Sequence, residues 1–320
     1  MSIAADLACA PAGPVPGHGA CLSCAFRSRR TFTRLLAGGA AAALVGPAWS
    51  QSTTTAAPQP GTEGGLRGEL GSPSRAAKLI PAEQVENAGS QQYLQLMREA
   101  GSQHALAPAD HPQVVRLRAI AQRLIPYTPA WNERARQWHW EVNLLGSPAL
   151  NAFCMPGGKI AFYFGILQKL QLDDDEVATI MGHEIAHALR EHARARMGKG
   201  LATRGAIEIG SALFGLGQFG RTVANAGGEL LTLRFSRDDE TEADIVGLDL
   251  AARAGYDPAA GVKLWRKMMA ANKGAPPQWL STHPASDTRI HEIQAKLPKV
   301  LPLYERAAKP EQRYSPPPAA

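Results

Sequence analysis

Two histidines four residues apart constrain this chain more than any other feature. The segment His183-Glu184-Ile185-Ala186-His187 lies in a run, 173–197, that begins with acidic residues, carries apolar residues at helical spacing and ends with arginines. This order suits the helix dipole at both ends. Residues four apart share one helix face, so both imidazoles can bind a single Zn²⁺, with Glu184 beside them to deprotonate a water. The segment predicts hydrolase chemistry.

A catalytic zinc needs a third protein ligand, and the segment 236–244 can supply it. It opens a second helical pattern that runs to about residue 254. Glu240 and Asp244 are four apart, so Glu240 can bind the metal while Asp244 accepts an N–H from a ligating imidazole. A solvated acidic face is the alternative interpretation, and it is our interpretation of Glu242, which points elsewhere on the same helix.

The first 50 residues predict an N-terminal extension followed by an export signal. Arg29 and Arg30 precede a weakly apolar run, 35–46, and a small-residue box at 48–50, which resembles a twin-arginine signal. The run is too short for the ~20 residues that span a bilayer. We therefore expect an exported, periplasmic protein, with membrane association as a further option.

Composition divides the remainder of the chain. Residues 51–76 are poor in apolar side chains and rich in helix and strand breakers, which predicts a disordered tether, and the proline-rich end, 307–320, predicts a disordered tail. Between them, 77–306 predicts one compact domain. Half of the formal net charge of +6 comes from the first 50 residues, and the remainder of the chain carries only +3, so nothing indicates a nucleic-acid partner.

The sequence patterns of this domain predict an α+β architecture that is mostly helical, with only a small β-sheet. Helical spacing marks 84–99 and 112–124, while 138–145 and 159–164 predict strands on either side of a turn. A bend at the glycine pair would lead onto an edge strand bordering the cleft, and an extended substrate could pair with such a strand. An ordinary hairpin turn is the alternative. The expected substrate-binding residues are Gly157, Gly158, Lys159, Ile160 and Ala161.

With these motifs in hand, the chain resembles the HtpX, BepA and Ste-type family of gluzincin zinc metallopeptidases over about residues 84–297. The resemblance rests on the two metal motifs and on three further segments, Asn151-Ala152-Phe153 with Pro156-Gly157-Gly158, 254–258, and Ser281-Thr282-His283-Pro284 with Arg289. Within this family the chain is similar to the compact soluble periplasmic branch (BepA-, LoiP- and Oma-like), as a form without transmembrane helices or C-terminal repeats.

The resemblance implies a zincin-like fold with one Zn²⁺ bound by His183, His187 and Glu240. It also implies that Glu184 acts as the general base and that Asp244 supports a ligand. The implied activity is endopeptidase cleavage of unfolded or misassembled envelope proteins. The alternative is a chaperone-like client-binding protein whose zinc site is latent or structural.

Several residues keep two interpretations. His283 either takes part in the site, as a fourth ligand or a stabiliser of the oxyanion, or packs at a helix start. Arg289 pairs with an acid of the fold or contacts substrate. Residues 206–220 form a buried hairpin or a mobile lid that touches membrane or clients. We expect His192 to face away from the metal and Cys154 to be a small packing residue, with a redox role as its alternative.

Overall fold

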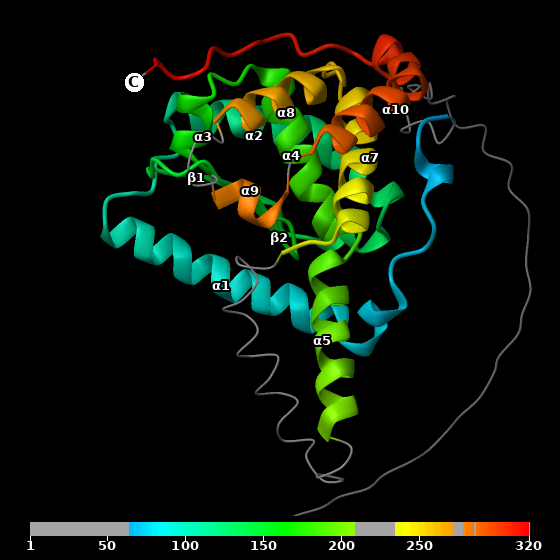
Figure 1. Ribbon diagram of the computed structural model, residues 1–320. Coiled ribbons are helices and arrows are strands. Elements are labelled where there is room, and N and C mark those ends of the chain that lie inside the picture. The colour runs from blue at the N-terminus through cyan, green and yellow to red at the C-terminus, as the bar shows by residue number, and fades with distance from the viewer. Residues whose placement is uncertain (1–63, 209–233, 272–277, 285, 320) are drawn as a thin grey trace, which may run out of the picture. The chain divides into compact units, whose positions relative to one another are not determined.

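One buried helix lies at the centre of the fold. The computed structural model describes residues 64–208, 234–271, 278–284 and 286–319. Helix α4 (Asp174–Leu189) buries every residue except one and contacts α2 (Pro112–Leu124), α7 (Arg237–Arg253), α8 (Ala260–Ala271) and the sheet (Figure 1). Asp173 and Glu176 form a reciprocal capping box at its start, which satisfies N–H groups that the helix leaves unpaired.

The sheet has three strands in the order β1-β3-β2 among the described residues. Strand β1 (Glu141–Leu145) runs parallel to β3 (Lys159–Tyr163), and β2 (Ala152–Met155) is antiparallel to it. The expected edge strand, β3, is therefore the central strand, and its backbone is paired on both sides. The edge that faces α4 is β2, a four-residue strand inside the segment expected to be a turn.

The remaining helices pack around this centre and confirm the α+β, mostly helical class. Two short 3-10 turns separate α2 from β1. The other described helices, in chain order, are α1 (Ala82–Ser102), α3 (Phe164–Lys169), α5 (His192–Glu208), α9 (Gln278–Thr282) and α10 (Asp287–Arg306).

The single helix expected over 173–197 is broken into α4 and α5. Glu191 adopts a φ of 56°, a left-handed conformation that ends a right-handed helix after its last turn. The chain changes direction there, and α5 packs against the segment 75–79 before its C-terminal end extends beyond the other elements in Figure 1. Periodicity alone does not reveal this break, because residues on both sides of it are good helix formers.

Helices α4 and α7 cross at a pair of glycines. A Cβ placed on Gly247 would lie 2.8 Å from the backbone nitrogen of His183, and one on Gly182 would lie 2.9 Å from the carbonyl oxygen of Gly247. Neither position has room for a side chain. The two backbones can therefore approach closely enough for side chains of both helices to meet at one point.

Two segments expected to be disordered are ordered where the structure describes them. Leu66 is fully buried and its N–H donates to Asp249, while Arg253 donates to the carbonyl of Gly64. In the C-terminal segment, Arg313 pairs with Asp175, and the Tyr314 N–H donates to Asp174. Low apolar content does not exclude such order, because single anchors and backbone hydrogen bonds hold both segments.

Among the described residues, no helix is both long and apolar enough to span a membrane. The expected export signal and residues 209–220 of the segment 206–220 lie outside the described residues.

Candidate metal centre

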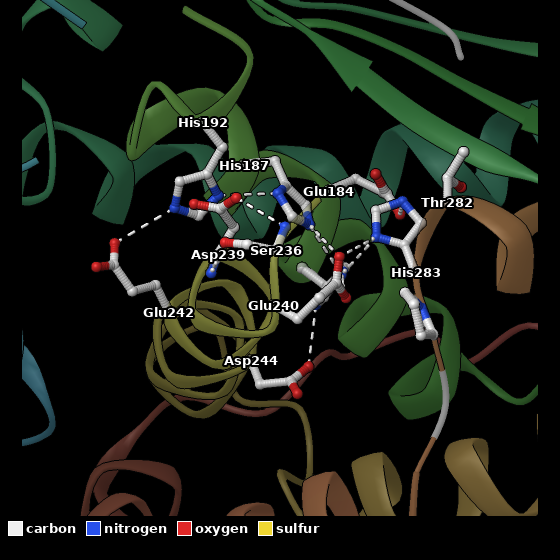
Figure 2. Close-up of polar contacts among 12 residues, drawn as sticks. Glu184, His187, His192, Ser236, Asp239, Glu240, Glu242, Asp244, Thr282 and His283 are labelled. Carbon is white, nitrogen blue, oxygen red and sulfur yellow. Dashed lines mark hydrogen bonds and ion pairs between the residues drawn. The ribbon is translucent and has the colours of Figure 1, made fainter. Parts of the chain in front are cut away.

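Four buried side chains from three parts of the chain bring one donor atom each to a common point. His183 and His187 come from α4, Glu240 from the first turn of α7, and His283 from the end of α9 (Figure 2). Each is at most 4% exposed, and the four donor atoms lie within 4.8 Å of one another. The structure thus brings together the three expected ligands and places His283 with them.

The distances between donor atoms fit a tetrahedral metal ion. His183 Nε2 lies 3.1 Å from His187 Nε2 and 3.5 Å from Glu240 Oε2, and His187 Nε2 lies 3.6 Å from Glu240 Oε1. His283 Nδ1 lies 3.3 Å from His183 Nε2 and 2.9 Å from Glu240 Oε1. Zinc bonds of ~2.0–2.1 Å give tetrahedral edges of about 3.3 Å. Two imidazoles and a carboxylate are also the ligand types of catalytic zinc sites.

Two buried side chains hold these ligands in place. Asp244 Oδ1 lies 3.0 Å from Nδ1 of His183 and therefore fixes the orientation of that ring with Nε2 toward the other donors. Arg289 donates to both oxygens of Asp244 at 2.7 Å and stacks on the ring of Trp265. Its Nη1 also lies 2.6 Å from Glu240 Oε2, although that oxygen accepts no well-aligned hydrogen bond. Arg289 therefore pairs with acids of the fold.

The electrostatics of the cluster favour a cation. Burial raises the pKa of Glu240, but the neighbouring His283, His183 and Arg289 outweigh it and hold that pKa below its ordinary value. Burial also raises the pKa of Asp244, but the neighbouring Arg289 and His183 outweigh it, so that pKa is lowered. Burial lowers the pKa of His183, yet Asp244 and Glu240 raise it to about 9. Both carboxylates are thus ionised at neutral pH.

The carboxylate of Glu184 points to the same region from α4. The indole N–H of Trp279 donates to its Oε1 at 2.6 Å, and His283 Nε2 lies 3.6 Å from that oxygen. Trp279 is fully buried and stacks on Trp265. Sequence spacing does not reveal Trp279, because it lies 95 positions from Glu184 and carries no ligand atom.

A cleft opens beside the four donors and encloses about 780 Å³, part of it open to solvent. Strand β2 forms one wall, and Val85 and Trp138 contribute apolar surface beyond it. Lys159 and Ala161, expected to bind substrate, lie on the central strand β3 and do not line this cleft. Ile160 is fully buried, and the glycine pair forms a left-handed turn between β2 and β3.

Cys154 of β2 lines the cleft but is 9% exposed. Burial, and secondarily the charge of Glu184, raise the pKa of its thiol well above the ordinary value. A thiol with a raised pKa is a poor nucleophile, which agrees with a packing role.

His192, which we expected to face away from the metal, contacts one of the ligands from behind, and Glu242 in turn contacts His192. His192 is 3% exposed, and its Nδ1 lies 2.9 Å from Nδ1 of His187. Glu242 contacts His192 and Arg190. The break at Glu191 turns His192 back onto the preceding helix. Our expectation assumed a continuous helix, in which His192 would point away from His187.

Comparison with known proteins agrees with the geometry. The model of peptidase family M48 matches residues 112–297. The mitochondrial metalloendopeptidase OMA1 of Schizosaccharomyces pombe is 33% identical over 210 residues, which cover 65% of this chain and 59% of that protein. The OMA1 of Saccharomyces cerevisiae is 31% identical over 68% of this chain and 65% of its own length. The metalloprotease LoiP of Escherichia coli is 28% identical over 63% of this chain and 78% of its own. The chain thus spans less than two thirds of these two OMA1 proteins.

Proposed function

Because the chain belongs to peptidase family M48, as its motifs predicted, we propose that it is a zinc-dependent endopeptidase. The observation that carries the proposal is the meeting of His183, His187 and Glu240 around one point, with the carboxylate of Glu184 beside them. A zinc ion held there supplies Lewis-acid polarisation of the scissile carbonyl and lowers the pKa of an adjacent water. Glu184 takes a proton from the attacking water and delivers it to the nitrogen of the leaving amine.

The contact of Glu184 with Trp279 supports this role. A general base must be held within hydrogen-bond reach of the proton that it removes. Trp279 donates to Oε1, so we assign the proton transfer to Oε2. The Glu184 side chain is buried, with 3% exposure. Helix α4 itself places it beside the ligands, because it carries His183 and His187 as well.

We propose that an extended peptide binds along β2. Tyr163 N–H donates to the carbonyl of Asn151, and in an antiparallel pair the hydrogen-bonded residues alternate. The backbone groups of Phe153 therefore face β3, while those of Ala152 and Cys154 face away from it. Both Ala152 and Cys154 line the cleft, so we infer that a peptide can add a strand to their outward groups. Unfolded or misassembled segments fit such an edge, because only an extended backbone can pair with it.

The position of His283 favours a closed resting site. Catalytic zinc sites keep one position open for water and substrate, but His283 Nδ1 stands where a fourth ligand would stand, 3.3 Å from His183 Nε2. Substrate binding would then have to displace this imidazole. A chaperone-like client-binding protein with the same closed zinc site is the second candidate function, and this observation is what favours it.

Location is a further proposal. The paired arginines and the apolar run of the first 50 residues support export to the periplasm, where misassembled envelope proteins would be the substrates. Fusion of those residues to a reporter that folds only after twin-arginine export tests this: export is expected, and it should be lost when both Arg29 and Arg30 are replaced by Lys. Retention of the wild-type fusion in the cytoplasm would refute the proposal.

Cleavage of casein, an unfolded protein, tests the activity when zinc content is measured on the same sample. We expect the wild type to hold one zinc and to cut, and Glu184→Gln to hold zinc without cutting. Glu133→Gln, which changes an exposed carboxylate in the same way, should cut like the wild type. If zinc is held and neither protein cuts, His283→Ala should release activity. If that variant is also silent, the peptidase proposal fails and the client-binding function is favoured.

A further inference from the structure

The two ligating imidazoles of α4 have different partners behind them. Each directs Nε2 to the common point, so each has its Nδ1 free to contact something else. For His183 that contact is the carboxylate of Asp244. For His187 it is another imidazole, that of His192, at 2.9 Å (Figure 2).

Only one arrangement of protons satisfies this pair of imidazoles once His187 binds a metal. The ligating Nε2 then carries no proton, so Nδ1 of His187 is an N–H and must donate. The facing Nδ1 of His192 must therefore accept, which places the proton of His192 on Nε2. That nitrogen lies 3.3 Å from Oε2 of Glu242, an acceptor in the required position.

Glu242 is itself fixed at the end of this chain of contacts. Arg190 Nε donates to the same carboxylate oxygen at 2.7 Å, and Arg190 also donates to the carbonyl of Gly71. Glu242 with Arg190 behind His192 thus parallels Asp244 with Arg289 behind His183.

The local backbone explains why His192 can reach His187. An uninterrupted helix would place residues five apart about 140° around the axis, so the two rings could not meet. The left-handed conformation of Glu191 starts α5 in a new direction with His192 as its first residue. The side chain then folds back over the last turn of α4.

We propose that His192, oriented by Glu242, is a positioning residue that holds the ring of His187 in the tautomer and orientation that binds zinc. The inference rests on the proposed zinc site but not on any peptidase activity. Helix α7 then supplies the three carboxylates that bind or orient the ligands: Glu240 directly, Asp244 through His183 and Glu242 through His192.

Zinc affinity, measured by competition with a chromogenic chelator, tests the proposal on the purified protein. His192→Phe keeps a flat ring but cannot accept a hydrogen bond, and we expect it to weaken zinc binding about 10- to 100-fold. In His192→Asn, Oδ1 takes the place of Nδ1 and can still accept, so the loss should stay within about 3-fold. His291→Phe, at an exposed histidine of α10, is the matched control and should bind as the wild type does.

Two further readouts separate positioning from general support of the fold. The visible spectrum of the cobalt-loaded protein should change in His192→Phe and be restored in His192→Asn, because it reports ligand geometry. The melting temperature of the metal-free protein should be similar in both variants. Wild-type affinity in His192→Phe, or an equal loss in both variants, would overturn the proposal. A protein that binds zinc with this pattern and yet cuts nothing would overturn only the peptidase function.

Discussion

Replacing Gly247 with alanine should damage the metal centre without touching a ligand. The added Cβ would lie 2.8 Å from His183 N and 3.1 Å from both Gly182 C and His183 Cα. Ordinary contact begins at about 3.4 Å, so α4 and α7 must separate by roughly 0.6 Å. All three obstructing atoms are backbone, and overpacking of this kind costs up to about 3 kcal/mol. Alanine returns about 1 kcal/mol of helix propensity.

The net loss should therefore be about 2 kcal/mol, which lowers the melting temperature by about 4 to 8 °C for a domain of this size. Metal sites tolerate only about 0.2 Å in ligand distances. Since His183 moves with α4 and Glu240 with α7, zinc affinity should fall at least about 10-fold.

Circular dichroism melting and chelator competition measure both effects. Gly261→Ala is the matched control, because it is also a helical glycine of the core but the new Cβ would meet its neighbours at 3.6 Å. It should melt at or above the wild-type temperature with unchanged zinc affinity. If Gly247→Ala behaves like this control, the glycine crossing does not set the geometry of the site.

Four further results are expected. Arg289→Met leaves Asp244 and Glu240 without their buried cation. The free energy of unfolding of the metal-free protein, measured in urea, should therefore fall by about 3 to 5 kcal/mol. The zinc-loaded protein should lose less, because the metal ion supplies positive charge at the same place. Leu66→Ala should cost about 2 to 5 kcal/mol, whereas an unchanged urea midpoint would show that the segment 64–80 contributes nothing. Burial raises the pKa of Tyr256 from 10 to about 12. The stability that the un-ionised Tyr256 contributes is therefore present below about pH 10 and is lost as the pH rises to 12, and the free energy of unfolding of Tyr256→Phe should fall less over that interval. The thiol of Cys154 should resist alkylation at pH 8 in the folded protein and react in urea; rapid labelling of Cys154 itself, distinguished by peptide mass mapping from Cys9, Cys21 and Cys24, would contradict its burial.

Local features of the site could be predicted from the sequence, because they depend on periodicity. The i, i+4 spacing places His183 and His187 on one face of α4, and the same spacing on α7 places Glu240 and Asp244 together. The caps at the starts of these helices are also local, since Asp173 and Ser236 contact residues three positions away.

Features that depend on a single backbone conformation or on distant contacts could not be predicted. Nothing in its side chain marks Glu191 for a left-handed conformation, and both the helix break and the position of His192 follow from it. The four residues of β2 are too few to show alternation clearly, so the sequence predicts the edge of the sheet at β3, which is the central strand. The contact of Trp279 with Glu184 joins residues far apart in the chain.

The most direct test of the metal centre is a crystal structure with diffraction measured above and below the zinc absorption edge. A single anomalous peak is expected ~2.0–2.2 Å from Nε2 of His183, Nε2 of His187 and a carboxylate oxygen of Glu240, with His283 Nδ1 as the fourth ligand in the resting protein. A peak elsewhere, or none in protein crystallised with excess zinc, would contradict the assignment of these residues as a zinc site.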